Sequence, residues 1–150
     1  MILVDADACP VKEEATRVAL RHGLPIVFVA NQGLRLPDHP LVRMFVVSNG
    51  FDAADDAIAA ASAPGRLVIT ADILLAERCL KAGAEVLDPK GRSFTADSIG
   101  GQIATRAIMA DLRAGLEGQG IGGQKPFTKA DRSRFLDALE TAVRRLPRAG

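Results

Sequence analysis

The sequence of 150 residues lacks tryptophan and tyrosine and contains only six phenylalanines. Aromatic residues make up 4% of the chain, too few for both a core and a platform of rings that stacks on nucleic-acid bases. Two cysteines, Cys9 and Cys79, exclude a disulfide framework. The two histidines, His22 and His39, and the two cysteines are not spaced like zinc ligands, which argues against a zinc site. No apolar run approaches the ~20 residues that span a bilayer.

The remaining composition is that of an ordinary globular protein. Hydrophobic residues account for 48% and charged residues for 25%, so we expect a single domain over residues 1–150. The first residues pass directly into an acidic motif without a signal peptide, which predicts a cytoplasmic protein with no membrane contact. The net charge of +1 is unevenly spread. Residues 1–75 carry six Lys or Arg against nine Asp or Glu, and residues 76–150 carry thirteen against nine.

Short apolar runs alternate with segments of helical periodicity along the chain. This alternation predicts a three-layer α/β/α sandwich with a central, mainly parallel sheet. Pro10 suits the first position of a helix, Thr128 suits the cap of the last helix, and five glycines between 115 and 123 predict a flexible loop. The predicted strands are 2–4, 25–30, 44–47, 67–70 and 85–87. The predicted helices are 12–22, 52–62, 73–81, 97–113 and 129–146, with the glycine-rich loop at about 115–124.

Carboxylates follow four of the predicted strands. They are Asp5 and Asp7 after the first strand, Asp52, Asp55 and Asp56 after the third, Asp72 after the fourth and Asp88 after the fifth. Ligands of parallel sheets bind at this carboxyl edge, near a switch in strand order. Each acid also has a structural interpretation, because Asp52 and Asp72 are good helix caps and Asp56 suits a first helical turn.

The group of acids carries more information than any one of them. Two like charges about 4 Å apart repel by about 4 kcal/mol at an effective dielectric constant near 20. A cluster of carboxylates therefore needs a neutralising partner, and a divalent cation with oxygen ligands, such as Mg²⁺ or Mn²⁺, meets that need. Cys9 has no histidine nearby in sequence to activate it, which favours a packing role over a nucleophilic one.

Three motifs together resemble the bacterial YaiI/YqxD family, which has a PIN-like domain. They are DADACPV at 5–11, GFDAADDAI at 50–58 and VITADILLA at 68–76, and PFTKADRSRF at 126–135 resembles the family's C-terminal pattern. The resemblance implies a PIN-like fold and a metal-dependent ribonuclease with Asp5, Asp55 and Asp72 as metal ligands. Asp7 and Asp52 match the family's motifs as well and are further candidates for metal ligands. Asp7 would otherwise support the metal ligands from behind or orient the attacking water. A fourth PIN acid has two candidates, Asp88 and Asp97.

The basic second half of the chain predicts contact with RNA, and nothing in the sequence predicts a reader of DNA sequence. The candidate phosphate contacts are Lys90, Arg92, Arg106, Lys125, Lys129 and Arg132.

Two other functions compete with the nuclease hypothesis. A non-catalytic PIN-like module would bind RNA or a protein without cleavage. A haloacid-dehalogenase-like phosphatase would also place a D-x-D motif after the first strand, with Asp5 as nucleophile, Asp7 as acid and Thr70 as its second motif. Against the phosphatase, the acidic pair Asp55 and Asp56 comes before Thr70, whereas that family has its acidic pair late in the chain.

Overall fold

One six-stranded sheet organises the described part of the chain. The computed structural model describes residues 1–7, 9–47, 53–115 and 126–147, with the backbone alone for residues 106–115. The strands are β1 (Ile2–Asp5), β2 (Ile26–Ala30), β3 (Val42–Val46), β4 (Leu67–Ile69), β5 (Glu85–Leu87) and β6 (Ser93–Phe94). The helices are α1 (Lys12–Arg21), α2 (Ala53–Ala61), α3 (Ile73–Lys81), α4 (Ala96–Gly115) and α5 (Lys129–Arg145).

The strand order β3-β2-β1-β4-β5-β6 contains one reversal of direction. The chain moves outward from β1 through β2 to β3, then returns to the other side of β1 with β4 and continues to β5. Strands β1 to β5 pair in parallel, and β6 alone runs antiparallel, against β5. The topological switch point therefore lies between β1 and β4, where a ligand site of an open parallel sheet is expected.

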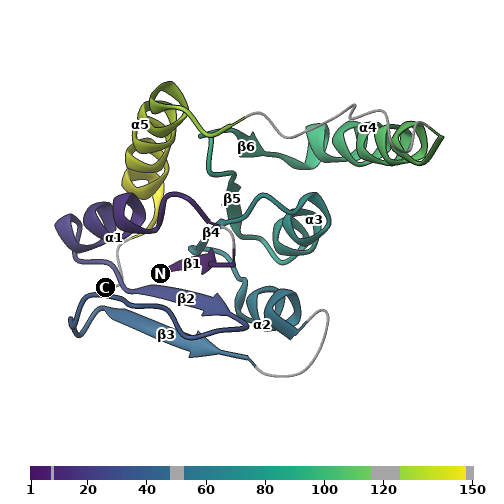
Figure 1. Cartoon of the computed structure of the whole chain (residues 1–150). Coiled ribbons are helices and arrows are strands. Elements are labelled where there is room, and N and C mark those ends of the chain that lie inside the picture. The colour runs from purple at the N-terminus through teal and green to yellow at the C-terminus, as the bar shows by residue number, and fades with distance from the viewer. Residues whose placement is uncertain (8, 48–52, 116–125, 148–150) are drawn as a thin grey trace.

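Helices cover both faces of the sheet, which confirms the predicted three-layer α/β/α sandwich (Figure 1). Strand β1 shows how the layers form, because successive side chains point to opposite faces. Ile2 and Val4 pack with α1 and α5, whereas Leu3 packs with α2 and α3. All three side chains are at most 2% exposed, so the central strand is buried on both faces as its uniformly apolar sequence predicts.

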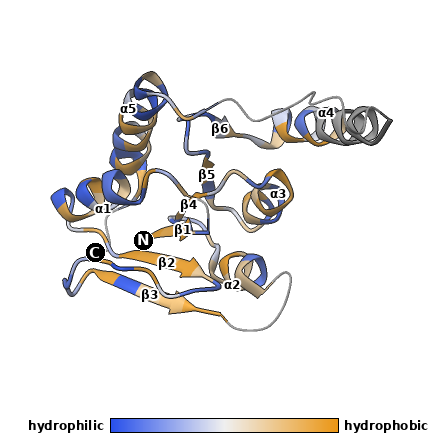
Figure 2. Cartoon of the chain, viewed as in Figure 1, coloured by the Kyte–Doolittle hydropathy of each residue, from blue (hydrophilic) through white to orange (hydrophobic). Residues whose placement is uncertain are grey.

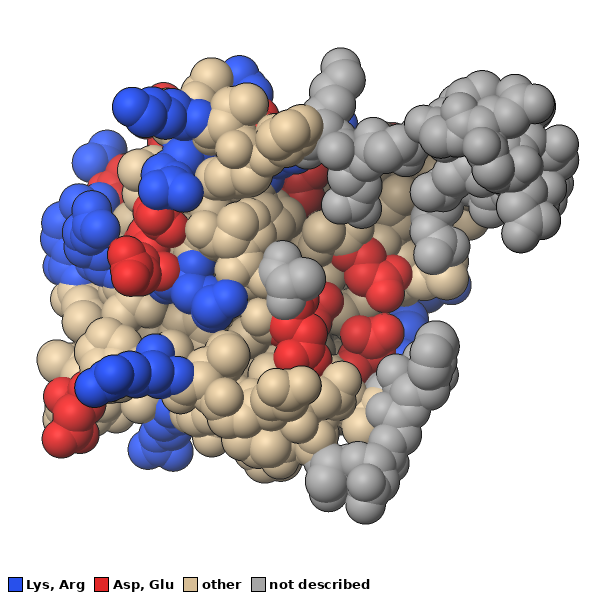
Figure 3. Space-filling view, in the orientation of Figure 1, with Lys and Arg blue, Asp and Glu red and all other residues tan. Residues whose placement is uncertain are grey.

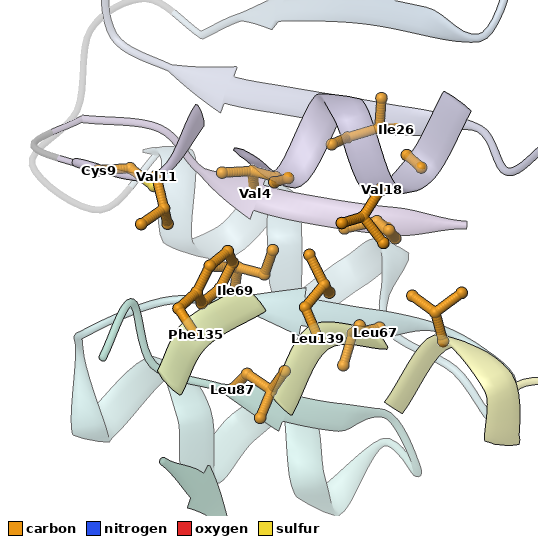
Figure 4. Packing of buried hydrophobic residues seen from close by; sticks show 14 of the residues in the cluster. Val4, Cys9, Val11, Val18, Ile26, Leu67, Ile69, Leu87, Phe135 and Leu139 are labelled. Carbon is orange, nitrogen blue, oxygen red and sulfur yellow. The ribbon is translucent and has the colours of Figure 1, made fainter. Parts of the chain in front are cut away.

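Helix α5 closes the first of these two cores. Its side chains Phe135 and Leu139 point toward Leu67, Ile69 and Leu87 of the sheet (Figure 4). The helix begins with a capping box, as the sequence predicts. The hydroxyl of the N-cap Thr128 accepts the backbone N–H of Asp131, and the Asp131 carboxylate accepts the backbone N–H of Thr128. Two backbone donors at the helix start are thereby satisfied.

Hydropathy follows the layers. Figure 2 shows the strands mostly hydrophobic, and helices such as α1 and α5 carrying one hydrophilic and one hydrophobic side. This pattern is typical of helices that pack on a sheet with one stripe and face water with the other. Within the described ranges, none of the helices combines the length and the apolar character needed to cross a membrane.

Apart from shifts of one or two residues at other element ends, the structure differs from the sequence-based expectations in four places. Helix α1 begins at Lys12 after Val11, so Pro10 precedes the helix instead of opening it. The third strand begins at Val42, two residues earlier than predicted. The short edge strand β6 was not predicted, because two residues carry no periodic pattern. Gly115 is the last residue of α4 and therefore does not belong to the predicted glycine-rich loop. Residues 116–124 of that loop lie outside the described part of the chain.

The turn between β5 and β6 is fixed by a close approach to α5. Gly91 has φ +87°, a conformation that L side chains rarely adopt. A Cβ atom at this position would lie 2.5 Å from the carbonyl oxygen of Arg134 and 2.8 Å from the backbone nitrogen of Phe135. The turn therefore rests directly on the backbone of α5, which only glycine allows.

We expect Gly91→Ala to lower the free energy of unfolding by about 3 kcal/mol or more, because strain and a backbone clash add. Gly23→Ala is the matched control: Gly23 also has positive φ, +67°, but nothing lies within 4 Å of its Cβ position. The control should cost only about 1 to 2 kcal/mol. Urea denaturation of both variants measures the difference. An equal loss of unfolding free energy in the two variants would show that α5 shifts to accommodate the new side chain.

Candidate active site at the carboxyl edge of the sheet

Asp5 and Thr70 meet at the switch point between β1 and β4. Asp5 is the last residue of β1, and Thr70 directly follows β4. The Thr70 hydroxyl donates to Oδ2 of Asp5 at 2.9 Å, and the backbone N–H of Asp72 donates to that hydroxyl at 3.0 Å. The parallel register of β1 and β4 brings these residues together, although 65 positions separate Asp5 from Thr70. This link orients the Asp5 carboxyl group.

The Asp5 carboxyl group lies in a strongly unfavourable place for a negative charge. Burial, together with the charges of Asp55, Asp72 and Asp7, raises its pKa to about 6, against the lowering effect of the Thr70 hydrogen bond. Within the described residues, no Lys, Arg or His side chain forms an ion pair with Asp5, Asp7 or Asp72. The site therefore concentrates negative charge around one half-buried carboxylate.

Asp72 and Asp7 flank Asp5, and each is held by backbone N–H groups. Asp72 is the N-cap of α3, where its Oδ1 accepts from Leu74 N at 2.9 Å and from Leu75 N at 3.3 Å. The capping interpretation of Asp72 is confirmed. Asp7 is exposed, and its Oδ2 accepts the backbone N–H of Asn31 at 3.0 Å, just beyond β2. Both side chains keep one carboxylate oxygen that accepts little or nothing from the protein.

The acids of α2 divide between two roles. Asp55 and Asp56 both lie in the first turn of the helix. Asp55 is half-buried and close enough to raise the pKa of Asp5, whereas exposed Asp56 forms an ion pair with Arg78 of α3 at 2.9 Å. Only Asp55 therefore belongs to the cluster around Asp5. Asp52 lies outside the described residues.

The two candidates for a fourth PIN acid have different surroundings. Asp88 is 8% exposed, and its carboxylate accepts from Lys90 N, Arg92 N and Arg92 Nε at 2.8 to 3.1 Å. These three donors occupy Asp88 in the turn after β5. Asp97 lies exposed in the first turn of α4. Neither acid is among the charges that act most strongly on Asp5.

The carboxylate oxygens around Asp5 suit a hard cation, but too few of them converge to enclose it. Among the described side chains, no group of three or more His, Cys, Asp or Glu converges closely enough to hold a metal ion. Mg²⁺ usually keeps several waters and binds through one or two carboxylates together with substrate phosphates, so it does not need such a group. Asp5 with one neighbouring carboxylate fits a hydrated ion of this kind. The ligand set Asp5, Asp55 and Asp72 stays a prediction.

Charge is sorted over the surface. Figure 3 shows Asp and Glu side chains grouped in the middle of the face, and Lys and Arg side chains mainly toward α1 and α5. Of the predicted phosphate contacts, Lys90 and Arg92 lie in the turn after β5, and Lys129 and Arg132 lie in the first turn of α5. The Arg106 side chain and Lys125 lie outside the described part.

Cys9 takes the predicted packing role. It is 5% exposed within the core beneath α1 and α5, and burial raises the pKa of its thiol. A raised pKa opposes the thiolate that a nucleophile needs. Its backbone carbonyl accepts from Lys12 Nζ at 2.7 Å, which fixes the chain between the cluster and α1.

Three further residues beside the site had no role in the sequence-based nuclease hypothesis. Thr70 joins Asp5 to Asp72, Glu14 is buried beneath Arg132, and Phe127 lies beneath the Arg132 guanidinium. A threonine after a strand and a glutamate in a helix are common in proteins without any role in a site, so the sequence gives no signal for them. Only the contacts between distant segments of the folded chain reveal these roles.

The comparisons with known proteins place the chain in a family. The family model described as "Uncharacterized BCR, YaiI/YqxD family" matches residues 3–145. The chain belongs to the YaiI/YqxD family. The resemblance of the three acidic motifs is thereby confirmed, and it extends over nearly the whole chain.

Relatives of this YaiI/YqxD chain match it from end to end. The UPF0178 protein of Jannaschia sp. (strain CCS1) is 66% identical over 146 residues, which cover 97% of this chain and 94% of the relative. That of Sphingopyxis alaskensis is 64% identical over 148 residues, or 99% and 96% of the two chains. One from Rhodopseudomonas palustris (strain HaA2) is 54% identical, over 98% and 88%. No solved structure matches the chain. These names state no activity, so function must be argued from the site.

We expect Asp5→Asn to stabilise the metal-free protein at neutral pH. The pKa of about 6 lies above that of an unfolded aspartate, so Asp5 favours folding below pH ~4, and this contribution is lost as the pH rises through 6. Asparagine keeps an oxygen for Thr70 and carries no charge. The gain at pH 7 should be about 2 kcal/mol, because each tenfold change in proton affinity is about 1.4 kcal/mol and solvent screens part of it.

Urea denaturation in EDTA at several pH values measures this effect as the stability difference between variant and parent. Asp137→Asn, which removes an exposed carboxylate of α5, is the control and should not gain stability at pH 7. A stability difference for Asp5→Asn that is the same at pH 4 and pH 7 would mean that the charge of Asp5 does not destabilise the folded protein.

Proposed function

We propose that this protein is a nuclease that hydrolyses phosphodiester bonds, with RNA as substrate, and depends on Mg²⁺ or Mn²⁺. The observation that carries the proposal is the position of Asp5. Its half-buried carboxylate stands at the switch point of the sheet, among Asp7, Asp55 and Asp72 and without an ion pair in the described part of the chain. Such a charge favours a divalent cation and, through it, a phosphate group.

The metal would be held by Asp5 together with Asp55 or Asp72, with Asp7 and Asp52 as further candidates. When bound, it supplies a water of lowered pKa and stabilises negative charge on the reacting phosphate. Thr70 keeps the Asp5 carboxylate in place. Asp7 is exposed and anchored by Asn31, so it can accept a hydrogen bond from the attacking water and orient it. Thr70 and Asn31 therefore act as positioning residues.

Charge on the surface supports a polyanionic substrate. The Lys and Arg side chains in the turn after β5 and at the start of α5 can contact substrate phosphates. They lie outside the acidic cluster, so the carboxylates of the cluster do not cancel their attraction for phosphate. The resemblance to PIN-like ribonucleases points to RNA. A non-catalytic RNA-binding module is the second candidate, and the finding that favours it is the lack of a converging group of three ligands among the described side chains.

We expect Mn²⁺ to raise the stability of the protein and to support cleavage of single-stranded RNA. At ~100 times the dissociation constant the gain should be about 2.7 kcal/mol. Asp5→Asn should abolish both the stabilisation and the cleavage, while Asp137→Asn should retain them. Thermal unfolding with and without Mn²⁺ and gel analysis of a labelled oligoribonucleotide measure the two effects.

Three results would change the proposal. Stabilisation by Mn²⁺ with RNA binding but no cleavage would support the binding module. Rapid release of phosphate from a small phosphomonoester, with a beryllium fluoride adduct on Asp5, would support the phosphatase hypothesis. A melting temperature that millimolar Mn²⁺ leaves unchanged would show that the site does not bind this metal.

A further inference from the structure

A large cavity opens beside the acidic cluster. Its volume is about 1050 Å³, and its walls come from the turn after β5, strand β6, the first turns of α4 and the segment before α5. It is also lined by Ala71 and Ile73, the two neighbours of Asp72, and by Pro10. The cavity therefore lies next to the proposed catalytic edge.

The walls combine flat apolar surfaces with a few polar groups. Phe94, Phe127 and Pro89 supply apolar surface, and Ser98, Gln102 and Thr105 supply hydroxyl and amide groups. An apolar site with a small number of hydrogen-bonding groups is typical of pockets for planar organic ligands. Although only six phenylalanines occur in the chain, two of them line this one cavity.

The charged residues of the cavity favour an anion. Among the described residues of its wall Asp88 is the only acid, and it is occupied by the backbone N–H groups of Lys90 and Arg92 and by the Arg92 side chain. The Lys90 ammonium forms no hydrogen bond or ion pair with another described residue. Lys90 can therefore donate to a ligand phosphate.

These groups are held in place by the fold. Asp88 ties the turn together, and Gly91 seats it on the backbone of α5. In the segment before α5, the Phe127 ring has its centre 5.5 Å from the Arg132 guanidinium. Arg132 in turn lies 3.5 Å from Oε1 of Glu14, a carboxylate that is buried in α1. Glu14 and Arg132 are thus positioning residues for Phe127.

We propose that this cavity binds one nucleotide of single-stranded RNA, with the base against Phe127 and a phosphate at Lys90. The inference rests on the proposed function, because the neighbouring phosphodiester would then lie at the Asp5 cluster. Stacking on a phenylalanine ring tolerates any base, and the amide of Gln102 and the hydroxyls of Ser98 and Thr105 can bond to base edges. The cavity holds the substrate, and the cluster cuts it.

The test compares a labelled single-stranded oligoadenylate with an abasic oligonucleotide of the same length, by fluorescence anisotropy in EDTA, where no cleavage occurs. The oligoadenylate should bind about tenfold more tightly or better, since it alone can stack. Phe127→Leu keeps an apolar side chain without the ring face and should remove about tenfold of that preference. Phe45→Leu, an exposed ring on β3, should change nothing.

Lys90→Ala should weaken the binding of both oligonucleotides by a similar factor, because it removes a phosphate contact. Lys81→Ala, an exposed lysine of α3 outside the cavity, is its control. Ultraviolet crosslinking of a 4-thiouridine oligonucleotide to the unaltered protein provides a second measurement that does not depend on how a variant folds. Crosslinks should map to peptides that contain Phe94 or Phe127.

Equal binding of the two oligonucleotides, or crosslinks confined to other segments, would overturn the nucleotide cavity even if RNA is cleaved with Mn²⁺. Base-dependent binding that needs Phe127 but leads to no cleavage with Mn²⁺ would uphold the cavity and reject the nuclease. Asp5→Asn separates the two further, because it should lose cleavage and keep base-dependent binding in EDTA.

Discussion

The parallel pairing of β1 with β4 is the constraint on which the candidate site depends. It places the end of β1 beside the end of β4, so that the Thr70 hydroxyl reaches the Asp5 carboxylate across the switch point. The same hydroxyl accepts from the backbone at the start of α3, which begins at its cap Asp72. One short contact thus couples the sheet, the cluster and a helix end. Because both strands are buried on both faces, a slip of their register would exchange side chains between the two packed cores.

The charge of the cluster opposes folding. Burial and three neighbouring carboxylates act together on Asp5, and the described residues bring no cation to balance it. Removal of this charge would make the protein more stable. Active sites often contain such destabilising arrangements, because activity requires them. The cost is met by the packing of two separate cores, one on each face of the sheet. The conflict between charge and burial is therefore local, and it marks the place where a ligand would restore balance.

The C-terminal part of the chain does more than cover a core. Helix α5 packs Phe135 and Leu139 on the sheet, supports the turn at Gly91 through its backbone, and carries Arg132 over Phe127. The last two of these contacts join α5 to the cavity, one at the turn after β5 and the other at Phe127. The segment before α5 and the turn after β5 are consequently held together next to the acidic edge.

The amino-acid pattern alone determined the alternation of strands and helices, the placement of acids after strands and the resemblance to the YaiI/YqxD family, because these follow from local periodicity and contiguous motifs. It could not rank the acids. Asp72 caps a helix, Asp56 pairs with Arg78, Asp88 is occupied in a turn and Asp5 carries the perturbed charge, yet all four simply follow strands. Only the tertiary structure decided among them, and only it brought Phe94 and Phe127 into one cavity, since hydrogen bonds and ring contacts between distant segments leave no periodic trace in a single sequence.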